Sequence, residues 1–267
     1  MAVPPEGCDP REIYCMHERT EQDRTGILQN FEKSEVKLMK KLGLIGGIGP
    51  ESTIEYYRGI EYGVQKRSSQ NFFPNITIES LNVFEVLNLC KKQDYDGLTD
   101  YLLNGINQLS AAGVQYAALT GITTHIVFDA LSKVSPVPLV SMVDTASEFA
   151  RAHGCRKVCL LGTLPTMNGT FFQKSFESKG IEVITPDTAE KEYISRKIET
   201  ELGKVISDTQ NNFRTIAERI IRDENVDTII LGCTELPLIF KEIDLSVPCL
   251  NVMQVHIDSL IDLIMSE

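Results

Sequence analysis

Val226–Phe240 reads VDTIILGCTELPLIF, an apolar run that ends in Gly-Cys-Thr-Glu before a second apolar run begins. Val114–Phe128 reads VQYAALTGITTHIVF and repeats this arrangement earlier in the chain. Short apolar runs closed by glycine or a polar turn predict buried strands, so each stretch predicts a strand followed by a loop. The two stretches look like copies of one unit, in which Cys233 of the later copy corresponds to Gly121 of the earlier one.

Strands and helices alternate on either side of these stretches, which is typical of an α/β fold with parallel sheets. In the first half the predicted elements are a strand at Leu42–Gly46, a helix from Ser52 with Ile54, Tyr57 and Ile60 at helical spacing, a strand at Ile76–Leu81, a helix at Leu98–Leu109 and a strand at Tyr116–Thr120. In the second half the corresponding strands are Val158–Gly162 and Thr228–Gly232.

The spacing of these elements supports a duplication. Gly46 and Gly121 are 75 residues apart, and Gly162 and Cys233 are 71 apart. Matched intervals of this kind predict two similar α/β domains, and if these face one another, the loops at the strand ends line one cleft. The expected organisation is a partly disordered extension at residues 1–39, a first domain at 40–139 plus 249–267, and a second domain at 140–248.

The composition limits the partners of the protein. Its 26 Lys and Arg residues against 37 Asp and Glu residues give a net charge of -11, which argues against nucleic acid because phosphate backbones bind clustered cations. Seven scattered cysteines without paired CxxC spacing predict free thiols in a reducing cytoplasm and no metal site. No apolar run reaches the ~18 to 20 residues of a membrane helix, so we expect a cytoplasmic protein without a membrane partner.

The loop after the first strand is a candidate anion site. Gly47, Ser52 and Thr53 lie between a strand and a helix, where backbone N–H groups and the helix dipole favour a carboxylate or phosphate. The loop lacks the last glycine of a dinucleotide-binding fingerprint, although Glu79 keeps that alternative open. A tight turn that needs glycine for its backbone angles is the other interpretation.

The corresponding loop of the second half contains Thr163 and Thr166. They could hold a second carboxylate or an ammonium group, or Thr166 could simply cap a helix. Cys233 precedes a predicted helix whose dipole would stabilise a thiolate, which makes it the best candidate for a reactive group. His125 and His256 could orient or protonate a thiol or a substrate, although a lone histidine on an amphipathic helix is usually structural.

From Lys41 to about Leu263 the chain resembles the aspartate/glutamate racemase family, through KLGLIGGIGPESTIEYYR, GVQYAALTGITTHIVFDAL, LLGTLPTM, IILGCTELPL and NVMQVH. The resemblance implies two similar α/β domains related by pseudo-twofold symmetry, with the active site in the cleft between them. It also implies a homodimer and racemisation of an amino acid without pyridoxal phosphate or another cofactor. In that family two cysteines act on opposite faces of the substrate Cα. One removes a proton and the other delivers one, while fixed donors stabilise the intermediate.

For this chain the resemblance implies a carboxylate-bearing substrate, a small acidic amino acid such as aspartate or glutamate. The catalytic candidates are Cys233, His125 and Thr120. The candidate substrate-binding residues are Gly47, Ser52, Thr53, Gly121, Thr123, Thr124, Thr163, Thr166, Thr234, Glu235 and His256.

The first motif departs from the family pattern, because Gly121 replaces the cysteine and Ile122 replaces an asparagine. Three activities therefore stay open. The first is racemisation by Cys233 with His125 or water as the second group, since a threonine hydroxyl is a poor base. The second is decarboxylation of a malonate-type acid by one cysteine, by resemblance to arylmalonate decarboxylase. The third is amino-acid binding without turnover.

Overall fold

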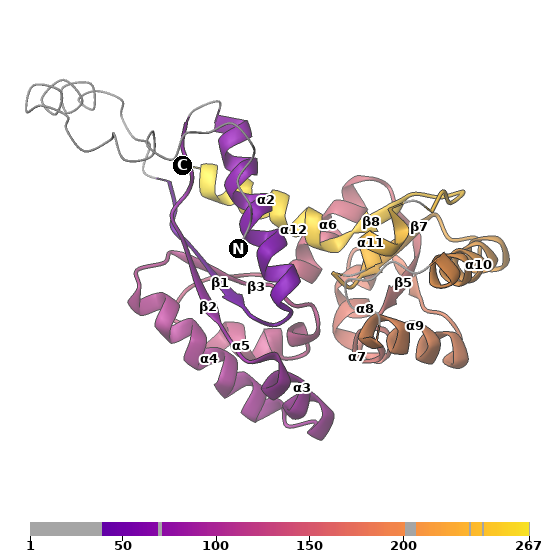
Figure 1. The fold of residues 1–267 in the computed structure, drawn as a ribbon, viewed down its shortest axis with the longest axis horizontal. Helices are drawn as coiled ribbons and strands as arrows, with labels where there is room; N and C mark the ends of the chain where they lie inside the picture. Colours follow the sequence, from indigo (N-terminus) through magenta and orange to yellow (C-terminus); the bar gives the residue numbers. More distant parts are fainter. Residues whose placement is uncertain (1–38, 69–70, 201–206, 235, 242, 267) are drawn as a thin grey trace, which may run out of the picture. The chain divides into compact units, whose positions relative to one another are not determined.

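The computed structural model describes residues 39–68, 71–200, 207–234, 236–241 and 243–266 (Figure 1). The predicted extension, apart from Met39, and the predicted ligand Glu235 lie outside these residues. The first half contains β1 (Leu42–Gly46), α2 (Pro50–Ser68), β2 (Ile76–Ser80), α3 (Val83–Lys92), α4 (Tyr95–Ala111), β3 (Tyr116–Leu119), the 3-10 helix η2 (Thr123–Val127), α5 (Phe128–Val134) and β4 (Leu139–Val140). The second half contains α6 (Met142–Ala152), β5 (Lys157–Gly162), α7 (Leu164–Asn168), α8 (Thr170–Glu177), β6 (Glu182–Ile184), α9 (Thr188–Thr200), α10 (Ser207–Glu224), β7 (Thr228–Gly232), α11 (Leu236–Phe240), β8 (Cys249–Asn251) and α12 (Val252–Met265).

Two parallel sheets of four strands have the same strand order. The first is β2-β1-β3-β4 and the second is β6-β5-β7-β8. β1 and β7 are buried along their whole length, as glycine-closed apolar runs predict. The predicted fold of two similar α/β domains is confirmed.

The strand registers make Gly121 and Cys233 equivalent. Ile45 of β1 pairs with Leu119 of β3, so that Thr120 follows level with Gly46 and its N–H bonds the Ile45 carbonyl at 3.1 Å. In the second sheet Gly162 pairs with Gly232. One residue beyond each pair, the chain reaches Gly121 in the first sheet and Cys233 in the second.

Helices α6 and α12 follow the last strand of each sheet and begin in the same way. Ser141 caps α6 by accepting the Asp144 N–H at 3.0 Å, and Asn251 caps α12 by accepting the Gln254 N–H at 3.2 Å. α12 packs against both α6 and α2 (Figure 1).

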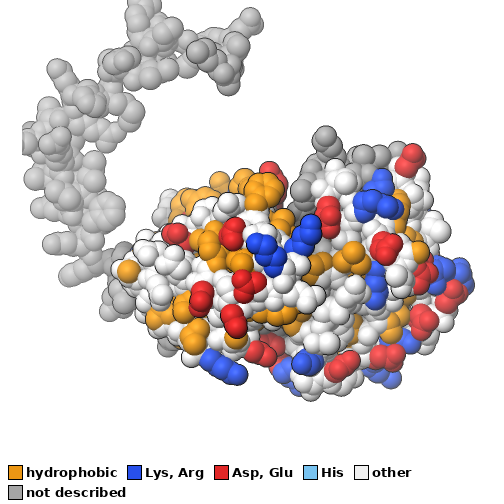
Figure 2. Space-filling model, turned by 90° about the horizontal axis from the view of Figure 1, so that it is seen from below, with side chains coloured by type: hydrophobic (Ala, Val, Ile, Leu, Met, Phe, Trp, Pro, Cys, Tyr) orange, Lys and Arg blue, Asp and Glu red, His pale blue; other side chains and the backbone are white. Residues whose placement is uncertain are grey.

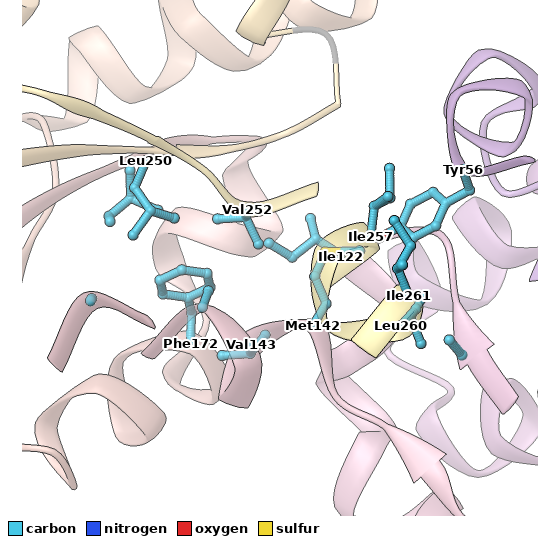
Figure 3. Close-up of a cluster of buried hydrophobic side chains, with 14 of the residues drawn as sticks. Tyr56, Ile122, Met142, Val143, Phe172, Leu250, Val252, Ile257, Leu260 and Ile261 are labelled. Atoms are coloured by element: carbon cyan, nitrogen blue, oxygen red, sulfur yellow. The ribbon is translucent and has the colours of Figure 1, made fainter. Parts of the chain in front are cut away.

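One apolar core joins the two sheets through these helices. It includes Leu44 of β1 and Leu160 of β5, both fully buried. Figure 3 shows Tyr56 of α2 beside Ile257 of α12 within the same cluster. Burial of a large aliphatic or aromatic side chain contributes roughly 1.5 to 3 kcal/mol, so the shared core holds the two sheets in a defined relation.

Two sequence-based expectations differ from the structure. Ile54 and Tyr57 are 50% and 48% exposed, because α2 turns Tyr56, Ile60 and Val64 inward instead. Residues 249–251, which the sequence assigned to the first domain, form β8 and pair with β7 of the second sheet. The chain therefore returns to the first half with α12, which packs against α2, rather than with β8.

Candidate functional site

The loop from β1 to α2 is held by its own hydroxyl groups. Gly47 has φ +73, and its N–H donates to Thr53 Oγ1 at 2.9 Å. Ser52 Oγ and Thr53 Oγ1 both donate to the Gly49 carbonyl, at 2.8 and 3.0 Å. Ser52 is buried, whereas Gly47 and Thr53 are partly exposed. The tight-turn interpretation accounts for these bonds, and the Gly47 N–H, which a bound anion would need, is used by Thr53.

At the end of β3 the polar side chains also turn to the backbone. Thr120 is fully buried and donates to the Ile45 carbonyl at 3.0 Å, while Thr124 donates to the Gly121 carbonyl at 2.7 Å. Thr120 Oγ1 lies 3.5 Å from Thr53 Oγ1, so the two loops of the first sheet touch. Each hydroxyl proton is used internally, which leaves neither threonine available as an acid.

Both ring nitrogens of His125 are occupied. Nε2 accepts the backbone N–H of Met142, the first residue of α6, at 3.1 Å. Nδ1 lies 3.2 Å from the Gly121 carbonyl and must therefore donate, which defines a neutral ring protonated on Nδ1. Burial lowers the pKa of His125 to about 4, outweighing the Gly121 carbonyl and Asp144, which raise it. This geometry favours a positioning role for His125 over proton transfer.

The loops of the second sheet present more accessible groups. Thr163 is partly exposed, and its hydroxyl lies 3.1 Å from that of the fully buried Thr166. Thr166 lies inside α7 instead of capping it. Cys233 and Thr234 are partly exposed, between β7 and α11. α11 has only five residues, so the expected support of a thiolate by its dipole is limited to one short helix.

His256 lies in the shared core and is fully buried. Tyr56 Oη lies 2.7 Å from His256 Nδ1, and burial, followed by the neighbouring His125, lowers the pKa of His256 to about 3. Within the described residues its Nε2 has no hydrogen-bond partner. The structure thus places His256 between α2 and α12, where it stabilises packing.

Accessibility divides the predicted residues into two groups. The buried ones are Ser52, Thr120, Gly121, Thr124, His125, Thr166 and His256. The partly exposed ones are Gly47, Thr53, Thr123, Thr163, Cys233 and Thr234. Cys233 is the member of the second group with a titratable side chain. By contrast, Cys159 is buried and its pKa is raised to about 12 by burial, so that thiol is inert.

A cavity of about 510 Å³ lies beside these loops, between the η2–α5 segment and the first turns of α6 and α8. His125, Phe128, Asp144, Phe171 and Lys174 are among its lining residues. Of the predicted site residues that the structure describes, His125 alone contributes to this lining.

The described part of the chain contains no cluster of three or more metal-ligating side chains. None of its helices is both long and apolar enough to cross a bilayer. On the face shown in Figure 2, acidic and basic side chains are interspersed rather than gathered into a basic stripe.

Three residues that organise the site could not be recognised from a motif or a repeat in the sequence. Ile48 packs beside Gly121, Tyr56 bonds His256, and Ser195 Oγ accepts the N–H of Leu164 at 3.0 Å.

Comparisons with known proteins agree with this arrangement. The sequence model described as Asp/Glu/Hydantoin racemase matches residues 45–260. The broad specificity amino-acid racemase RacX of Bacillus subtilis (strain 168) is 25% identical over 214 residues, which are 79% of this chain and 92% of that protein. A candidate Asp/Glu racemase from Yersinia pestis has a TM-score of 0.79 and 32% identity, covering 85% of this chain and 100% of that chain. An aspartate racemase homologue from Pyrococcus horikoshii OT3 has a TM-score of 0.74 and 36% identity, with the same two coverages. The chain therefore belongs to the Asp/Glu/hydantoin racemase family.

Proposed function

We propose that the protein is a cofactor-independent amino-acid isomerase that acts on a small acidic amino acid, such as aspartate or glutamate, through Cys233. Membership of the family supports the reaction class, and the named relatives include amino-acid racemases. The observation that carries the assignment to Cys233 is its partial exposure, where Thr120, Thr124 and His125 are buried and bonded to the backbone.

The proposed step is a proton transfer at Cα. The Cys233 thiolate removes the α-proton, so that the C–H bond breaks, an S–H bond forms, and the electron pair moves into the carboxylate. Return of the proton from the thiol regenerates the starting enantiomer. Protonation by water from the opposite face gives the other one, and the thiol then gives its proton to the hydroxide that the water leaves, which restores the thiolate. Thr123, Thr163 and Thr234 are the partly exposed hydroxyl groups that we assign to the carboxylate, which needs fixed donors as charge develops.

Exchange of the α-proton in heavy water tests this assignment. Proton NMR of D- and L-aspartate and of D- and L-glutamate should show loss of the α-proton signal with the wild-type protein. Cys233→Ser should slow that exchange by a factor of about 100 or more, since general acid–base groups typically contribute that much. Cys90→Ser in α3 is a matched control, because Cys90 is also partly buried. Unchanged exchange in Cys233→Ser would refute the assignment.

A second candidate follows from the same single thiol. In a malonate-type acid the C–C bond to one carboxylate breaks, carbon dioxide leaves, and the Cys233 thiol protonates the resulting enediolate. The thiolate then regains a proton from solvent. Release of carbon dioxide from such acids, without α-proton exchange in aspartate or glutamate, would favour this reaction over isomerisation.

We also propose that the enzyme works as a cytoplasmic homodimer. An apolar contact surface on and near α2 is formed by exposed side chains. The rings of Tyr62 and Phe73 have centroids 5.8 Å apart, and Ile54 and Tyr57 are also exposed. The scattered cysteines, which lack paired CxxC spacing, support a reducing compartment. Light scattering after gel filtration should give twice the chain mass, and Tyr62→Glu should shift it towards the monomer, whereas the exposed Phe149→Glu in α6 should not.

A further inference from the structure

The space beside Gly121 is already filled. A Cβ atom added to Gly121 would lie 2.9 Å from Ile48 Cγ2, 3.2 Å from the Ile48 carbonyl oxygen and 3.4 Å from Ile48 Cβ. The first of these distances is shorter than real Cβ contacts allow, and the γ-methyl of a β-branched side chain cannot swing away freely. Gly121 is not among the glycines with positive φ. Packing against Ile48, rather than backbone conformation, therefore requires glycine here.

Ile48 is itself firmly held. It lies between Gly47, with φ +73, and Gly49, with φ +100. Residues other than glycine rarely adopt these positive φ angles, so the turn that positions Ile48 depends on its two glycines. Its side chain is 9% exposed and belongs to the buried cluster that contains Leu119 and Val127. The Ile48 side chain cannot vacate the position beside Gly121 without disturbing this cluster.

The position equivalent to Gly121 in the second sheet has different surroundings. There the residue one step beyond the strand pair is Cys233, which is partly exposed. Leu164 stands where Ile48 stands in the first sheet, two residues after the last residue of the central strand. It is partly exposed, and its N–H is bound by Ser195 Oγ at 3.0 Å.

We infer that Ile48 and Gly121 form a matched pair that closes the first-sheet side of the site to any acid or base side chain, so that Cys233 acts from one face only. This inference rests on the proposed function, because it assigns the face of Cα from which the Cys233 thiol works. One enantiomer presents its α-proton to Cys233, and that proton exchanges with retention of configuration. The other enantiomer presents its proton to the closed side, where Gly121 offers no acid or base side chain to remove it.

Exchange in heavy water reports this asymmetry directly. In the wild type, one enantiomer should exchange its α-proton at least tenfold faster than it racemises, and its mirror image should exchange at least tenfold more slowly. Gly121→Cys alone should keep this pattern, because Ile48 blocks the new side chain. Ile48→Ala combined with Gly121→Cys should open the closed side and add exchange of the second enantiomer, raising racemisation about tenfold or more. Ile48→Ala combined with Gly121→Ala supplies the same Cβ without a thiol and should add nothing.

Thermal unfolding of the same variants tests the pair independently of activity. Gly121→Ala should lower the Tm by roughly 5 °C in the presence of Ile48, as expected for overpacking, and by much less in the Ile48→Ala background. Equal losses in both backgrounds would overturn the inference, as would second-enantiomer exchange in Gly121→Cys alone or its absence in a folded double variant. If the wild type exchanges neither enantiomer, the proposed function fails, and the Tm comparison still decides whether the pair is matched.

Discussion

The ends of β3 and β7 occupy equivalent positions in two sheets of the same strand order, yet their surroundings are opposite. The carbonyl of Gly121 accepts Thr124 Oγ1 at 2.7 Å and lies 3.2 Å from His125 Nδ1. The carbonyl of Cys233 accepts the backbone N–H of Leu236 at 3.3 Å. In the first sheet, the side chains of Thr124 and His125 are buried and bond the loop backbone, whereas Cys233 in the second sheet is partly exposed. In two halves of the same fold, the loop after β3 can thus have a structural role while the loop after β7 carries the candidate catalytic residue.

The loops after β1 and β5 give the largest expected contrast in stability. Gly47→Ala should destabilise the fold by about 3 to 4 kcal/mol, because a Cβ there meets the Leu81 carbonyl oxygen at 2.2 Å and φ is +73. Thr163 occupies the equivalent place with φ -72, so Thr163→Ala should cost only about 1 kcal/mol. Urea unfolding followed by circular dichroism measures both. Similar losses for the two variants would mean that the loops are not specialised as described.

The first sheet should also contribute a pH-dependent part of the free energy of unfolding through His125. The equivalent residue of the second sheet is Pro237, which does not titrate. The pKa of His125 is lowered to about 4 in the fold, against about 6.5 in an unfolded chain, so the unfolded state binds more protons between these values. The free energy of unfolding should therefore fall as the pH drops from 6.5 to 4, by about 1.4 kcal/mol per pH unit from His125.

A variant isolates this contribution. Burial lowers the pKa of His256 to about 3, which acts in the same direction, and raises the pKa of Glu61, which acts in the opposite direction. Only a difference between proteins is therefore informative. His125→Asn retains a donor for the Gly121 carbonyl but does not titrate. Its free energy of unfolding, measured in urea at pH 7, 5.5 and 4.5, should show a shallower pH slope than the wild type. Parallel slopes would contradict the assignment of a neutral, buried His125.

Much of the framework was predictable, because apolar runs closed by glycine encode buried strands locally. The matched intervals likewise predicted that Gly121 and Cys233 are equivalent. The inward face of α2 was not predictable in the same way. Tyr56 is buried because its hydroxyl meets His256, 200 residues further on, and this contact outweighs the spacing that favoured Ile54 and Tyr57.

The chemical types of the site residues were predictable, but their directions were not. Thr120 and Thr123 are the same residue type in one short loop, yet the first is buried and the second is partly exposed. The difference depends on which carbonyl oxygen lies within reach, here that of Ile45 on the neighbouring strand. The glycine at 121 showed where a side chain was missing, while Ile48, which fills the space, became apparent only from the packing.

The smallest expected effect concerns Thr120. The sequence made it a catalytic candidate, but the comparison of the loops after β3 and β7 assigns it a structural role. Thr120→Val keeps the shape of the side chain and removes its donation to the Ile45 carbonyl, which still accepts the Thr120 N–H at 3.1 Å. Because that carbonyl keeps a partner, the loss should be only about 1 kcal/mol of stability. The α-proton exchange rate should stay within about threefold of the wild type, since the hydroxyl donates to the backbone and not to the substrate. A loss of exchange comparable to that expected for Cys233→Ser, with a normal Tm, would show that Thr120 is catalytic. It would also contradict the conclusion that the loop after β3 is structural and the loop after β7 is catalytic.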